Sequence, residues 1–127
     1  MHSVGKINRD IYKCITENIV TDEVIITDER IEHIEQGHPG DYRRFGKYIP
    51  TIISEPDYLI RDDRANTAMV LKMIMDDNTG EYFRLALRLV TSSDNPSYKN
   101  FVITFMHIRK REYERIVRNK EVLYKKE

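Results

Sequence analysis

The spacing of the apolar residues changes once along this chain, and the change divides it into a helical part and a sheet part. Up to Ser54 the apolar side chains recur every three or four residues, whereas beyond Glu55-Pro56-Asp57 they alternate with polar ones. The first spacing is typical of helices that bury one side, and the second is typical of strands. Proline between two acidic residues is a break between elements. We therefore expect helices first and a sheet second.

Three helical segments are predicted in the first part. One covers residues 6–17. The next covers residues 28–36, and Thr27 before it is a good N-cap because its hydroxyl can accept from a backbone N–H of the first turn. The third covers residues 42–54 and contains Pro50, so we expect it to be kinked or divided into two short helices.

The second part predicts an antiparallel sheet, because the connections between its strands are too short for parallel crossovers. A short C-terminal helix over residues 109–118 and an edge strand over 122–124 follow. The fold class expected is α+β, a single domain over residues 1–127 with the N-terminal helices packed on one face of a four-stranded antiparallel sheet. Its strands are residues 58–62, 67–75, 81–91 and 101–108.

The composition is that of a globular protein, with 40% hydrophobic and 33% charged residues among 127. No apolar run approaches the roughly 18 residues that span a bilayer, and the start of the chain lacks the apolar region of a secretory signal. The one cysteine, Cys14, excludes an internal disulfide and is expected to be a small buried residue. These features predict a cytoplasmic protein without a membrane segment.

Charge is distributed unevenly although the formal net charge is zero. From Arg109 onward there are eight Lys or Arg against four Asp or Glu, and the rest of the chain has the opposite imbalance. A basic end permits contact with nucleic acid, but a nonspecific polyanion binder would be basic throughout.

One face of the predicted sheet carries cations and a hydroxyl. Arg84, Arg88 and Thr104 have the parity opposite to the apolar residues of their strands, and Lys72 joins them if its strand is in register. Such a group is suited to binding phosphate. The alternative is an ordinary solvated face with long cationic side chains lying over it.

Two histidines bracket the end of the second predicted helix. His33 follows Arg30 by three residues, so their side chains share a side of that helix, and His38 lies just past Gly37. Two imidazoles can divide the roles of base and acid near neutral pH. A metal site with Asp41 as third ligand is the alternative, although a five-residue spacing is poor for two ligands on one helix.

In order along the chain, the segments resemble a known family. They are similar to the phage-type members of the barnase–EndoU–colicin E5/D–RelE-like nuclease group, in its second phage subfamily (PBECR2). The segments that carry the resemblance are ITDERIEHIEQGHPGD, NTAMVLKMI, FRLALRL, NFVITFMHI and the ending LYKKE.

The resemblance implies N-terminal helices on a four-stranded antiparallel sheet and a metal-independent ribonuclease of phage or toxin systems, without a cofactor. RNA is the implied substrate, and an immunity protein or antitoxin is a partner that it allows. At Phe101 the family more often has a small hydroxyl residue, which leaves Thr104 as the hydroxyl. The residues that it implies are His33, His38, Lys72, Arg88 and Thr104 as catalytic, and Arg30 as substrate-binding. We also expect Arg84, from its place on the cationic face, and Tyr124 to bind substrate.

The mechanism expected from this set uses the 2′-hydroxyl of RNA as the nucleophile and forms a 2′,3′-cyclic phosphate. His33 would take the proton and His38 would protonate the leaving oxygen, or the reverse. Lys72 and Arg88 would stabilise the charge on phosphate. Two alternatives remain: a noncatalytic module of the same fold that binds RNA or protein, and a metal-dependent hydrolase.

Overall fold

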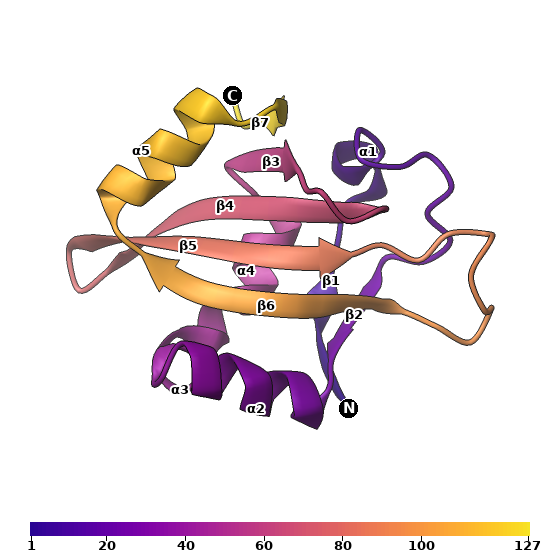
Figure 1. Ribbon diagram of the computed structural model, residues 1–127, viewed down its shortest axis with the longest axis horizontal. Helices are drawn as coiled ribbons and strands as arrows, with labels where there is room; N and C mark the ends of the chain where they lie inside the picture. The colour runs from indigo at the N-terminus through magenta and orange to yellow at the C-terminus, as the bar shows by residue number, and fades with distance from the viewer.

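One seven-stranded sheet forms the frame of the molecule, which a computed structural model describes over residues 1–127 (Figure 1). The strand order across it is β1-β2-β6-β5-β4-β3-β7. The strands are β1 (His2–Lys6), β2 (Glu23–Ile26), β3 (Tyr58–Arg61), β4 (Thr67–Asp76), β5 (Thr79–Arg88), β6 (Asn100–Ile108) and β7 (Val122–Lys125). The helices are α1 (Arg9–Tyr12), α2 (Asp28–Gly37), α3 (Asp41–Phe45), the 3-10 turn η1 (Gly46–Tyr48), α4 (Ile49–Ser54) and α5 (Lys110–Asn119).

The hairpin of β4 and β5 sets the register of the centre of the sheet. Its strands pair over ten residues each, and Asp77 and Asn78 make the two-residue connection with φ values of 49° and 66°. Two such residues with positive φ match the twist of a hairpin. Because the turn leaves no freedom in the pairing, Lys72 lies opposite Phe83 and Arg88 opposite Thr67.

The predicted four-stranded antiparallel sheet was wrong. The four expected strands are present, but β2 joins the edge of β6 in parallel, β1 pairs with β2, and β7 pairs with β3, which makes a mixed sheet of seven strands. These edge strands are only four or five residues long, and their partners lie far away in the sequence. Local alternation cannot show a pairing such as that of Ile25 with Phe101, because tertiary context decides it.

The predicted helix over residues 6–17 was also wrong, since only Arg9–Tyr12 is helical. The chain before it belongs to β1, which crosses α4 closely at Gly5. Gly5 has φ +117°, and a Cβ there would lie 3.5 Å from Pro50. Glycine is therefore favoured by the backbone conformation, whereas a Cβ at that distance would make an ordinary van der Waals contact.

The other predicted helices are confirmed with adjusted ends. α2 begins after Thr27, whose hydroxyl accepts from the backbone N–H of Arg30 at 3.1 Å. The stretch over 42–54 is divided as expected, but at Gly46–Tyr48. Pro50 lies in the first turn of α4, where no N–H is needed.

Helices lie on both faces of the sheet, which corrects the expectation that they cover one face. α2, α3 and α4 pack with the main core on one face, around buried side chains such as Phe45, Phe83 and Phe105. On the other face, Ile116 of α5 packs against Met69 and Leu71. In Figure 1, α4 passes behind the sheet and no helix crosses β5 or β6 in front. We call this uncovered part the open face; it consists of Arg84, Ala86, Arg88, Phe101, Thr104 and Met106.

Candidate functional site

The open face is built by the register of four strands, because cross-strand partners point to the same side of a sheet. Leu85 and Leu87 belong to the main core, so the residues between them point the other way. The side chains on this side form three rows across the strands: Thr67, Arg88, Phe101 and Ile25; Met69, Ala86 and Thr104; Leu71, Arg84 and Met106.

Arg84 is a cation without a partner. Its side chain makes no hydrogen bond or ion pair within the chain, although it is only partly exposed. The carboxylates of Asp62 and Glu112 lie near enough for the Arg84 charge to affect their pKa values. Arg64 and Arg115, which donate hydrogen bonds to them, are the main cause of their lowered pKa values, and the Arg84 charge adds to the effect. A guanidinium with free donors on an open face is suited to an external anion.

Arg88 is held by the loop that connects β5 and β6. Its guanidinium donates to the carbonyl oxygen of Leu89 and to both carboxylate oxygens of Asp94, at 3.3 and 3.0 Å. The hydrogen bond from the Thr91 backbone N–H and the ion pair with Arg88 lower the pKa of Asp94. Arg88 therefore orders the loop, and donors remain on a group that has five.

Thr104 lies beside Ala86, and its hydroxyl makes no hydrogen bond within the chain. The register shifts between Ala86 and Leu87, where Ile103 is the extra residue of a β-bulge. Bulges change the direction of neighbouring side chains and are common next to active sites. The structure thus brings three of the predicted residues, Arg84, Arg88 and Thr104, to one face.

Lys72 lies on the opposite face, so the expectation that it shares the face of the arginines was wrong. Its cross-strand partner is Phe83 of the main core, and its residue is only 7% exposed. The Lys72 ammonium is 3.2 Å from Asp57, which also accepts from the hydroxyl of Tyr113 at 3.0 Å. Burial and the nearby Asp57 carboxylate raise the pKa of Tyr113, so this hydroxyl stays a donor. The geometry indicates a structural ion pair.

The two predicted histidines do not share a side of α2. His33 is exposed and lies with Arg30 on the same flank of the helix, where both line a shallow hollow. His38 is the C-cap, partly buried, and its N–H donates to the carbonyl oxygen of Ile34 at 2.7 Å. At 3.6 residues per turn, five residues separate directions by about 140°. Only His33 lies on the flank that carries Arg30.

Arg30 connects that flank to the open face. It also lines a pocket of about 460 Å³ together with Phe101 and Ile25, which are partners in the first row. We call this the aromatic pocket; its other residues are Met1, Thr27, Glu29, Ser97, Tyr98 and Lys99. Tyr98 was not predicted to lie at the surface, although its place in the polar loop before β6 is a signal for exposure.

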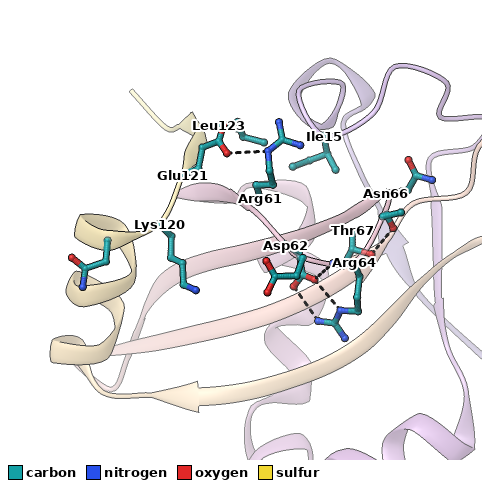
Figure 2. A pocket seen from close by; sticks show the side chains of 12 residues that line it. Ile15, Arg61, Asp62, Arg64, Asn66, Thr67, Lys120, Glu121 and Leu123 are labelled. Carbon is teal, nitrogen blue, oxygen red and sulfur yellow. Dashed lines mark hydrogen bonds and ion pairs between the residues drawn. The ribbon is translucent and has the colours of Figure 1, made fainter.

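Tyr124, predicted to bind substrate, lies away from the open face. It pairs with Leu59 in β7 and packs against the main core. A second pocket, of about 540 Å³, lies where β3 and β4 are connected (Figure 2). Its ion pair of Arg61 with Glu121 is exposed, whereas in the pair of Arg64 with Asp62 the Asp62 side chain is almost buried. Thr67 of the first row also lines it.

No group of three or more His, Cys, Asp or Glu side chains is arranged to hold a metal ion. None of the helices has the length and apolar character needed to cross a bilayer.

Comparison with known proteins gives one match. No curated protein and no solved structure matches the chain. One protein family does match, over residues 1–125, and its description is phage-Barnase-EndoU-ColicinE5/D-RelE like nuclease2. That range contains every strand and helix of the structure, and the match confirms the family that the sequence resembled. The chain therefore belongs to the PBECR2 family of phage-type nucleases.

Proposed function

We propose that this chain is an endoribonuclease that cleaves RNA without a metal ion and leaves a 2′,3′-cyclic phosphate. The observation that carries the proposal is the unpaired Arg84 guanidinium on the open face, which also carries Arg88 and the free Thr104 hydroxyl. Two guanidinium groups and a hydroxyl are donors that match the oxygens of a phosphodiester. Family membership supports phosphodiester cleavage as the reaction.

RNA carries its own nucleophile, so the protein has to position a phosphate and manage protons. The 2′-oxygen bonds to phosphorus and loses its proton to a base, while the bond from phosphorus to the 5′-oxygen breaks. Arg84 and Arg88 stabilise the negative charge that builds on the nonbridging oxygens, and Thr104 donates to one of them. His33 on the flank of α2 is the proposed base.

The proton for the leaving 5′-oxygen comes from water in this scheme. His38 was the expected acid, but its place at the end of α2 is not on the flank of His33. Arg30 lies between His33 and the open face and is proposed to bind the RNA backbone.

A second candidate is a module that binds RNA without cleaving it. The separation of His33 and His38 favours this candidate, because only one imidazole is on the flank that leads to the open face. It predicts salt-dependent binding of RNA with no product formed.

Cleavage of labelled RNA in EDTA tests the proposal. Wild type is compared with His33→Ala, Arg84→Met and Thr104→Val, and with Met75→Ala, a matched surface control at the hairpin. We expect a cyclic-phosphate product from wild type and from the control, and at least tenfold slower cleavage by the other three. Activity that EDTA abolishes, or that survives unchanged in the three site variants, contradicts the proposal; binding without a product supports the second candidate.

A further inference from the structure

The aromatic pocket is formed by segments that are distant in the sequence. Ile25 comes from β2, Arg30 from α2, and Tyr98 and Phe101 from the end of the loop before β6 and from β6 itself. Its volume of about 460 Å³ is in the range of small-ligand sites. Its lining combines apolar and aromatic side chains with the cations Arg30 and Lys99 and the carboxylate of Glu29.

Two aromatic rings are available in this pocket. Tyr98 is 58% exposed, which is unusual for a large aromatic residue of this chain. Earlier in its loop, Asp94 accepts hydrogen bonds from Arg88 and from the N–H of Thr91. Phe101 is fixed in the sheet between Ile25 and Arg88. A ring held in a sheet, as that of Phe101 is, loses little entropy when a flat ligand stacks on it.

The rim has an available positive charge. The Arg30 side chain makes no hydrogen bond or ion pair within the chain. The Lys99 ammonium is 2.5 Å from the Glu23 carboxylate, which largely neutralises its charge. A neutral planar ligand attached to an anion matches an aromatic floor beside an unpaired guanidinium better than an apolar peptide does.

The pocket is also continuous with the proposed catalytic face. Phe101 is the cross-strand partner of Arg88, and the Cβ atoms of such partners are about 5 Å apart. Thr104 follows on the same strand. Phe101 therefore belongs both to the aromatic pocket and to the open face.

We propose that the aromatic pocket binds a nucleobase of the RNA, the one attached to the phosphate that is cleaved. This inference rests on the proposed function and adds a base subsite to it. Stacking on Tyr98 and Phe101 supplies affinity that phosphate contacts alone do not give. It also fixes which phosphate is placed at the open face.

The test measures binding with oligonucleotides that cannot be cleaved. A labelled 2′-O-methyl oligoadenylate of six nucleotides is compared, by fluorescence anisotropy, with a matched oligomer of the same phosphates without bases. The proteins are wild type, Tyr98→Ala, Phe101→Leu and the control Met75→Ala. Met75 lies at the hairpin end of β4 and is not part of the aromatic pocket. Tyr98 is exposed, so its replacement leaves the fold intact; Phe101→Leu keeps an apolar side chain and removes the ring.

We expect wild type and Met75→Ala to bind the oligoadenylate about tenfold more tightly than the oligomer without bases. Each aromatic variant should lose most of that preference, while its Kd for the oligomer without bases stays within about twofold of wild type. Equal binding of the two oligomers by wild type, or a preference that both variants keep, overturns the inference. Neither oligomer can be cleaved, so the binding result does not depend on catalysis. Absence of RNA cleavage would refute the proposed function, and the binding measurement would still test the base subsite.

Discussion

Lys72 and Arg84 lie on neighbouring strands but point to opposite faces of the sheet. Lys72 pairs across the strands with Phe83, whereas Arg84 pairs with Leu71. Lys72 is 3.2 Å from Asp57 and almost buried, and Arg84 has no partner. One cation therefore belongs to the fold, and the other is available to a ligand.

Removing the partner of Lys72 should destabilise the protein. Asp57 accepts from Lys72, from the N–H of Met73 at 2.7 Å and from the hydroxyl of Tyr113. Asp57→Ala leaves a nearly buried ammonium without a counter-charge, which costs about 3 kcal/mol. Urea denaturation measures the loss. Asp63→Ala, at an exposed carboxylate without a hydrogen bond, is the control and should stay within about 0.5 kcal/mol. A loss below 1 kcal/mol for Asp57→Ala would refute the structural role.

The loop that carries Tyr98 should loosen in acid. The pKa of Asp94 is lowered in the folded protein by the Thr91 N–H and by Arg88, so its contribution is complete above the unfolded value of about 3.9. That contribution is lost as the pH falls through the lower folded pKa. The amide shift of Thr91, followed by NMR from pH 6 to pH 2, should titrate with a midpoint below 3.9.

Arg88→Gln separates the two causes of that shift. It should raise the midpoint but leave it below the unfolded value, because the Thr91 hydrogen bond remains. A wild-type midpoint at or above 3.9 would contradict the observed contacts of Asp94.

Two glycines offer a matched test of the backbone conformation of β1 at Gly5. Gly5→Ala forces a Cβ into a backbone conformation with φ +117° next to Pro50, and should destabilise the fold by about 1–3 kcal/mol. Gly37→Ala, at the end of α2 with nothing within 4 Å, should be neutral or stabilising by up to about 1 kcal/mol. Thermal unfolding of both variants measures the difference. Equal effects would contradict the positive φ of Gly5.

The pH dependence of cleavage distinguishes one imidazole from two. If His33 alone acts, as a base, kcat/KM rises with pH to a plateau, and His38→Ala retains the wild-type profile. A bell-shaped profile that loses its descending limb in His38→Ala would instead restore His38 as the acid. Steady-state cleavage of a short RNA from pH 5 to pH 9 provides both profiles.

The sequence predicted those features of the fold that depend on residues close together in the chain. The N-cap at Thr27 and the alternation in β5 depend on neighbouring residues, and both were confirmed. The mixed sheet was missed because β1 and β2 take their place through partners that are distant in the sequence.

The site was predicted in part for the same reason. Arg84, Arg88 and Thr104 share a face because parity along a strand is local, whereas the position of Lys72 depended on the register of a neighbouring strand. The aromatic pocket was not predicted, since β2, α2 and β6 meet there only in the folded chain. The catalytic roles of these residues stay predictions.

The central claim is that RNA is cleaved at the open face, and one pair of variants tests it most directly. Arg84→Met and Lys72→Met each remove one cation and keep an unbranched apolar side chain, from opposite faces of the same sheet. Cleavage of RNA in EDTA, with each rate corrected for the folded fraction, should fall at least tenfold in Arg84→Met and stay within about twofold in Lys72→Met. The reverse result, full activity without Arg84 and loss of activity without Lys72, would contradict it.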